Sequence, residues 1–136
     1  MRFEPLEHTA DKGIRAFGRD MKELFENAAY GMFSLMADLT LYAPSEGREI
    51  EAQASDDSEL LRAWLAELLY QFEVERILFV DFHVEEIAEG QVKGTAQGLP
   101  FDGVEWLGSQ VKAVTHHDLE INRTDDCLQA IVIFDV

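Results

Sequence analysis

Two acidic positions at opposite ends of the chain carry the chemistry that this sequence could perform. The segment His8–Asp11 (His-Thr-Ala-Asp) follows the first strand-like stretch, and Asp135 and Val136 end the chain directly after an apolar run. Because the apolar pattern continues to the last residues, we expect the terminal carboxylate to be held beside the Asp135 side chain. If the first and last strands are close, Asp11, Asp135 and the carboxylate of Val136 converge as hard oxygen donors. Such a cluster suits a divalent cation, Ca²⁺ or Mg²⁺, and is repulsive without one.

The same residues can also have roles that do not involve a metal ion. Asp11 can stabilise a turn through its own backbone, and Asp135 can be a solvated residue at the chain end. Lys112 is either an exposed charge on a strand or a cation that faces an anionic cluster or a partner's phosphate. If a metal ion held by Asp11 and Asp135 were to activate water, His8 is the candidate general base that the sequence offers.

The sequence lacks the motifs of the familiar enzyme classes. It contains no Gly-rich phosphate-binding loop, no pair of cysteines, no paired-His zinc motif and no Gly-flanked nucleophilic serine. Most familiar enzyme classes therefore lose support. Its one cysteine, Cys127, cannot form an internal disulfide, which favours a location in the reducing cytoplasm.

The charge balance argues against tight, direct binding of nucleic acid. The chain has 27 acidic and 11 basic residues, a formal net charge of −16 at neutral pH. Nucleic-acid affinity depends largely on Lys and Arg that neutralise phosphates, and a strongly anionic protein repels the phosphate backbone. Docking on a basic partner protein is compatible with this charge. Charged residues interrupt every apolar stretch before the roughly 20 residues that a membrane crossing needs, so we expect no membrane segment.

Two stretches have apolar residues at helical spacing. The first runs over residues 21–36, where Asp20 is a suitable N-cap and Glu23 completes a capping box. The second follows the capping residues 56–58 and shows a wide apolar face over residues 60–72. Both faces predict helices that pack against a sheet.

Other stretches alternate apolar and polar residues as strands do. They cover residues 3–8, 14–18, 48–54, 77–86, 91–97, 111–121 and 128–136, with turns expected at residues 11–13 and 122–126. A run of strands after the second helix argues against repeated βαβ units. We therefore predict one α+β domain over residues 1–136, with two helices on a mostly antiparallel or mixed β-sheet; a second sheet layer is left open.

Five segments, taken in their order along the chain, resemble the archease family over essentially the whole sequence. Each segment alone is short, and the resemblance depends on their order and spacing. They are His-Thr-Ala-Asp at 8–11 followed by Gly-Ile at 13–14, Leu-Phe-Glu-Asn-Ala-Ala at 24–29, the run from Trp-Leu to Glu-Leu-Leu-Tyr at 64–70, Lys-Ala-Val-Thr at 112–115, and the terminal Asp-Val.

The resemblance implies an accessory protein rather than an enzyme. Archeases are known as cofactors of the RtcB-type RNA ligase, which joins RNA ends after tRNA intron removal or during RNA repair. They promote guanylylation of the ligase by GTP and allow multiple turnover. A chaperone-like role toward a tRNA methyltransferase or another RNA-modifying enzyme is the alternative. A small metal-dependent hydrolase is the third hypothesis. Family folds are α+β, with helices packed on a sheet.

The resemblance also implies a metal site. The family's ligands correspond to Asp11, Asp135 and Val136, and Ca²⁺ has been associated with the site, with Mg²⁺ or Mn²⁺ as other candidates. Lys112, from the Lys-Ala-Val-Thr segment, is likewise implied to be functional.

Two positions depart from the family pattern. Lys12 stands where the motif usually has an apolar residue, and His116 stands where Tyr commonly follows Lys-Ala-Val-Thr. A cation directly after Asp11 puts the strength of metal binding in question. Neither departure removes an implied ligand.

Overall fold

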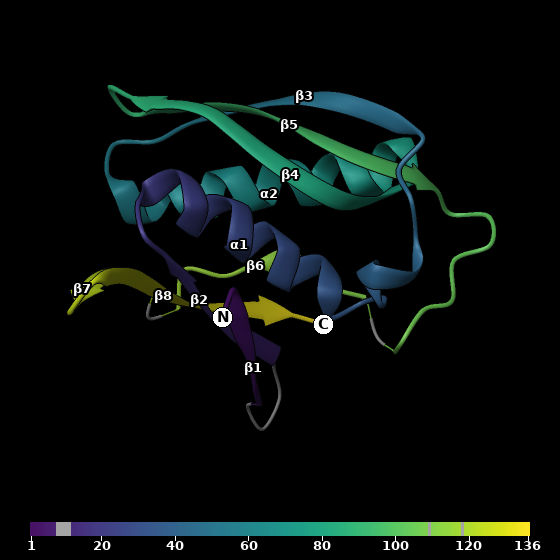
Figure 1. The fold of residues 1–136 in the computed structure, drawn as a ribbon, viewed down its shortest axis with the longest axis horizontal. Coiled ribbons are helices and arrows are strands. Elements are labelled where there is room, and N and C mark those ends of the chain that lie inside the picture. The colour runs from purple at the N-terminus through teal and green to yellow at the C-terminus, as the bar shows by residue number, and fades with distance from the viewer. Residues whose placement is uncertain (8–11, 109, 118) are drawn as a thin grey trace.

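The fold has three layers, with two helices between two antiparallel sheets (Figure 1). The structure is a computed structural model that describes residues 1–7, 12–108, 110–117 and 119–136. The predicted α+β class is confirmed, and a second sheet layer is present. Because the helices lie between the sheets, the core continues from one sheet through the helix layer to the other.

The first sheet contains the beginning and the end of the chain. Its strand order is β1-β2-β8-β6, and β7 also pairs with β8, all antiparallel. The strands are β1 (Phe3–Glu7), β2 (Lys12–Gly18), β6 (Ala113–Val114), β7 (Glu120–Thr124) and β8 (Cys127–Asp135). The second strand of the chain, rather than the first, therefore lies beside the last.

The second sheet is formed by the middle of the chain. Its order is β3-β5-β4, with β3 (Glu46–Gln53), β4 (Ile77–Ala88) and β5 (Gln91–Pro100). Alternate residues of β5 are buried toward the helices, as expected for a sheet with one solvated face.

Both helices begin at an aspartate whose side chain accepts a backbone N–H. In α1 (Met21–Ser34) the Asp20 carboxylate accepts from the N–H of Glu23 at 2.9 Å. In α2 (Asp57–Glu75) the Asp56 carboxylate accepts from the N–H of Glu59 at 2.8 Å. These caps satisfy donors that a helix leaves unpaired at its start. A short 3₁₀ helix, η1 (Leu39–Leu41), follows α1.

The turn predicted at residues 11–13 is wrong for its last two residues, which belong to β2. Gly13 suggested a turn, yet its role is close packing. A Cβ atom at Gly13 would lie 2.8 Å from Cδ1 of Ile133 and 2.9 Å from the carbonyl oxygen of Val132. Only glycine allows β2 and β8 to approach this closely.

The single strand predicted over residues 111–121 is also wrong. The chain forms β6 and leaves the sheet after Thr115, whose backbone N–H still donates to the carbonyl of Ile133 at 3.0 Å. The Thr115 hydroxyl donates to the same carbonyl at 3.0 Å and accepts from the N–H of His117 at 3.2 Å. Such local side-chain bonds compete with a continued ladder.

The polar run at 122–126 extends a strand instead of forming a long turn. Residues 122–124 pair with residues 127–129, which leaves a two-residue turn with φ of 38° at Asp125. Polar residues suit this strand because its side chains are largely exposed. No helix within the described residues is long and apolar enough to span a membrane.

Candidate functional site

The start of β2, the end of β8 and the short strand β6 meet at one edge of the first sheet. Lys12 is the register partner of Phe134, and Phe134 is also the partner of Val114. One position further along, Asp135 is the partner of Ala113. Three of the five segments that suggested the family therefore reach this edge. The segments at 112–115 and 135–136 contribute residues to it, and the segment at 8–11 ends directly before Lys12 in the sequence.

The last residues of the chain are fixed by packing and by hydrogen bonding. Phe134 is fully buried, Asp135 is exposed, and Val136 is half-buried against the core. The backbone N–H of Lys112 donates to the carbonyl oxygen of Asp135 at 2.7 Å. The expected apolar strand up to the chain end is thus observed, with the Asp135 side chain directed to solvent.

The structure describes only some of the predicted metal ligands. His8 and Asp11 lie outside the described residues, although Glu7 and Lys12 on either side of this segment pair with each other. In the described part of the chain, no three His, Cys, Asp or Glu side chains form a group that could hold a metal ion. The metal site stays a prediction.

The donor chemistry of the chain end fits a hard cation. Asp135 has no ion pair or side-chain hydrogen bond with another described residue, so its carboxylate oxygens remain available there. Together with the terminal carboxylate of Val136 it offers only oxygen donors, which Ca²⁺ and Mg²⁺ prefer. Asp11 is the residue predicted to add further oxygen donors.

Lys112 lies at a hollow between β6 and α2. The hollow has a volume of ≈ 230 Å³, and Arg62, Ala66, Tyr70 and Glu73 of α2 also line it. Lys112 is exposed and forms no ion pair with any described residue. Its ammonium group is therefore available to an anion.

A polar network that sequence analysis did not find joins the segment after β6 to α2. Nδ1 of His116 lies 2.9 Å from Oε1 of Glu59, and Nε of Arg62 donates to Oε2 of Glu59 at 3.2 Å. The hydrogen bond with His116, and then the one with Arg62, lower the pKa of the Glu59 carboxyl below its usual value. The residues are far apart in the sequence, and no periodic pattern signals their contact.

Several polar side chains in the family-like segments form hydrogen bonds that connect the layers of the fold. The carboxylate of Glu26 accepts from the N–H of Val84 in β4 at 2.8 Å, and the Asn27 amide donates to a carbonyl of β2 at 2.7 Å. The indole of buried Trp64 donates to the carbonyl of Phe25 at 3.1 Å. These side chains connect α1 to both sheets and to α2, so their role is structural.

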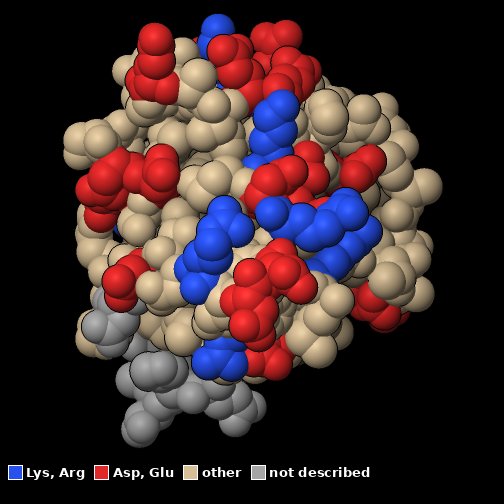
Figure 2. Space-filling view, turned by 60° about the vertical axis from the view of Figure 1, so that its left-hand side comes forward, with Lys and Arg blue, Asp and Glu red and all other residues tan. Residues whose placement is uncertain are grey.

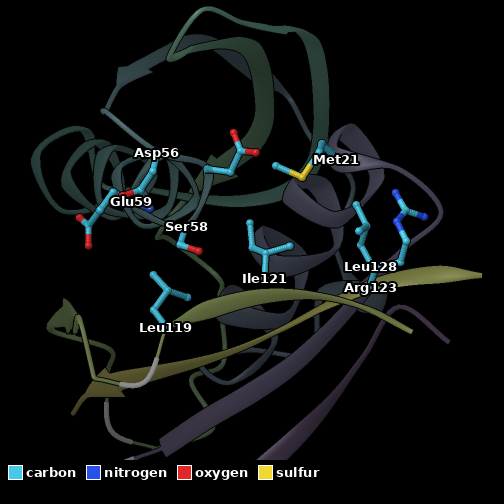
Figure 3. A pocket seen from close by; sticks show the side chains of 9 residues that line it. Met21, Asp56, Ser58, Glu59, Leu119, Ile121, Arg123 and Leu128 are labelled. Carbon is cyan, nitrogen blue, oxygen red and sulfur yellow. Dashed lines mark hydrogen bonds between the residues drawn. The ribbon is translucent and has the colours of Figure 1, made fainter. Parts of the chain in front are cut away.

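A second hollow, of ≈ 580 Å³, lies at the start of α2 (Figure 3). Asp56, Asp57 and Glu59 line its α2 side, whereas Leu119 and Ile121 come from the chain at β7. Two of these three carboxylates are already used, one as the helix cap and the other in the network with His116 and Arg62. Among the described residues, the hollow brings together no catalytic set.

Nearly the whole chain matches a known protein family. The model of the "Archease protein family (MTH1598/TM1083)" matches residues 3–136. The chain belongs to the archease family. The resemblance stated from five short segments is confirmed over nearly the whole chain.

Curated relatives of this archease match it over almost their whole length. The protein archease of Methanosarcina barkeri is 39% identical over 145 residues, which cover 98% of this chain and 95% of the relative. The protein archease of Methanothermobacter thermautotrophicus is 41% identical over 137 residues, with 98% of both chains covered. The domain described above is therefore the size of these relatives.

Solved structures have the same fold as this archease. The solution structure of Methanobacterium thermoautotrophicum protein 1598 superimposes with a TM-score of 0.87 at 39% identity, covering 99% of both chains. A crystal structure from Thermotoga maritima, described as an archease and possible chaperone, gives a TM-score of 0.67 at 19% identity, covering 98% of this chain and 96% of that one. The second match shows the fold alone.

Proposed function

We propose that this archease is a non-enzymatic activator of an RtcB-type RNA ligase in tRNA splicing and RNA repair, where it promotes guanylylation of the ligase by GTP and multiple turnover. Family membership supports the proposal. The main structural support for it is the position of Lys112 beside Asp135. These two family-like segments, distant in the sequence, share one sheet edge. A partner protein can therefore contact both at once.

The charge of the chain supports action through a protein partner. A net charge of −16 favours rapid encounter with a basic surface and opposes tight binding of RNA by the free chain. On the face shown in Figure 2, Lys and Arg side chains are interleaved with Asp and Glu and form no unbroken basic patch. Arg15 forms an ion pair with Glu4, and Arg19 forms one with Glu23. RNA association is then a property of the complex with the ligase.

Each residue of the site has a distinct part in this proposal. Asp11, Asp135 and the carboxylate of Val136 would hold a divalent ion, with Ca²⁺ the first candidate and Mg²⁺ or Mn²⁺ the others. When bound, the ion supplies positive charge at the sheet edge. The ammonium of Lys112 adds a second positive charge toward phosphate groups or the attacked histidine of the ligase. His8 is not required as a general base, because the archease itself catalyses no reaction. The single cysteine is consistent with work in the cytoplasm.

Single-turnover guanylylation of the ligase with labelled GTP tests the proposal. Sub-stoichiometric archease should raise both the rate of guanylylation and the number of turnovers in RNA ligation. Lys112→Ala should abolish this gain and leave the ligase's own basal activity unchanged. A ligase that is guanylylated at the same rate with and without the wild-type archease would show the proposal to be wrong.

A chaperone-like role toward a tRNA methyltransferase or another RNA-modifying enzyme is the second candidate. Its support is the description of the Thermotoga maritima relative as a possible chaperone. Protection of a methyltransferase from aggregation, together with no effect on ligase guanylylation, would favour this role. The same guanylylation assay thus separates the two functions.

A further inference from the structure

Two of the family-like segments line one hollow, and its lining contains an aromatic side chain as well as positive charge. Tyr70 of α2 and Lys112 beside β6 both border the ≈ 230 Å³ hollow described above. The proposed function uses Lys112 only as a cation toward a phosphate. It leaves Tyr70 and the remaining lining residues without a role.

Tyr70 is placed where packing does not explain an aromatic residue. Its side chain is 60% exposed, whereas Leu68 and Leu69 directly before it are buried. Its hydroxyl forms no hydrogen bond with any described residue. A large exposed ring at the rim of a hollow is a surface on which a flat ligand can stack.

The charges of the lining have the opposite sign to the chain as a whole. Arg62 and Lys112 are the cations, and Glu73 is the one carboxylate among the lining residues. Arg62 uses Nε in its bond with Glu59, which fixes the side chain and leaves its terminal nitrogens available. The ammonium of Lys112, which forms no ion pair with a described residue, and the terminal nitrogens of Arg62 therefore offer N–H donors to a small anion.

Small residues keep the hollow accessible between its two walls. Ala66 of α2 and Ala113 of β6 lie on opposite sides of it, and neither side chain extends beyond Cβ. We propose that this hollow binds a nucleoside phosphate. The base stacks on Tyr70, and the phosphate lies against Lys112 and Arg62. Glu73 offers carboxylate oxygens to N–H donors at the edge of the base.

The size of the hollow indicates a shared site. Its ≈ 230 Å³ is below the roughly 300–1,000 Å³ of a complete small-molecule pocket. A second protein must therefore cover the rest of the nucleotide. This step rests on the proposed function, in which the second protein is the ligase and the nucleotide is its GTP. The free archease should then bind a nucleotide only weakly, with a Kd of about 1 mM.

Titration of the isotope-labelled archease with GMP, followed by NMR, tests the binding directly. Chemical-shift changes should be concentrated in residues 62–73 and 112–114, and they should be larger with GMP than with inorganic phosphate. Equal changes with phosphate alone would reduce the hollow to an anion site and overturn the proposal. Changes confined to another surface, or none, would overturn it as well.

Paired variants separate stacking from charge. Tyr70→Leu should weaken GMP binding about fivefold or more, because stacking on an aromatic side chain contributes about 1–3 kcal/mol per base. Tyr70→Phe keeps the ring and should change the Kd by less than about twofold. Arg62→Gln should weaken binding, whereas Lys93→Gln, which removes the same charge from an exposed position of β5, should not. Equal effects of the last two variants would mean that only net charge matters, which contradicts the proposal.

Assays with the ligase distinguish failure of this inference from failure of the proposed function. In archease-stimulated guanylylation, Tyr70→Leu should raise the KM for GTP and leave kcat nearly unchanged. If the wild-type archease stimulates the ligase but Tyr70→Leu changes neither this KM nor the GMP titration, the nucleotide site is wrong and the activator function stands. If the wild type gives no stimulation, the activator function is wrong, and a positive GMP titration still supports the site.

Discussion

The backbone N–H of Lys112 donates to the carbonyl oxygen of Asp135 at 2.7 Å, so the cation and the terminal acidic residue of this archease are held together by the main chain. The relative position of the two backbones does not depend on side-chain conformation. A change that disturbs the last strand pairing is therefore expected to affect both residues together.

A C-terminal extension should reduce stimulation of the ligase. It converts the Val136 carboxylate into a neutral amide and adds bulk where β6 begins and β8 ends. The fold should persist, because Val136 is half-buried and the core residues of β8 precede it. The comparison is between C-terminally and N-terminally tagged proteins in the guanylylation assay, with circular dichroism as the check on folding. Equal stimulation by both would show that the terminal carboxylate is not a ligand.

Replacement of either predicted acidic ligand should weaken divalent-ion binding. Asp11→Ala and Asp135→Ala each remove hard oxygen donors, so calorimetric titration with Ca²⁺ should show a lower affinity with the fold intact. Asp102→Ala, at an exposed position after β5, is the matched control and should bind Ca²⁺ as the wild type does. Unchanged affinity in both ligand variants would rule out the metal site, and loss of folding would make these residues structural.

The helices could be predicted from the sequence because each buries a continuous stripe. The predicted faces of α1 and α2 include the residues that are buried in the structure, from Leu24 to Phe33 and from Leu60 to Phe72. The pairing of the strands could not be predicted, since alternation does not say which strands pair. Gly13 illustrates the difficulty: glycine signals a turn in the sequence, but here it allows two strands to approach.

The candidate site could be predicted only as a set of residue types. Hard oxygen donors at residues 11, 135 and 136 were apparent from composition and chain position, but their neighbours were not. The contact of Lys112 with Asp135 depends on the pairing of β6 with β8, and alternation over residues 111–121 does not show where this short strand ends or which strand it pairs with. The bond between Glu59 and His116 joins residues that are far apart in the sequence, in a segment that leaves the sheet after Thr115.

Trp64→Phe should destabilise the archease although the aromatic ring is retained. The indole N–H of Trp64 is the donor to the Phe25 carbonyl, and both residues are fully buried. Loss of this donor removes a buried hydrogen bond to a carbonyl oxygen of α1 and leaves a small cavity, which should lower the free energy of unfolding by about 1–3 kcal/mol. Urea denaturation measures the change. Trp106→Phe is the control, because Trp106 is only half-buried and its indole donates no hydrogen bond to a described residue; a similar loss in both variants would contradict the role of the Trp64 bond.

The bond between Glu59 and its two partners should make stability depend on pH in one direction. His116 first, and then Arg62, lower the pKa of the Glu59 carboxyl in the folded protein. A carboxyl with a lowered pKa stabilises the fold at pH values above its unfolded pKa, and this contribution is lost as the pH falls through the folded value. The stabilisation should therefore be present near neutral pH and disappear in acid.

Glu59→Gln provides the measurement. The amide side chain of this variant cannot ionise, so the difference in melting temperature between the wild type and the variant should be largest in the mildly acidic to neutral range. It should shrink as the pH is lowered through the range where the Glu59 carboxyl takes up its proton. Glu49→Gln, at an exposed position on β3 with no side-chain ion pair in the described part of the chain, controls for the change in net charge. A pH-independent difference for Glu59→Gln would mean that the contact with His116 and Arg62 does not depend on the ionised carboxylate.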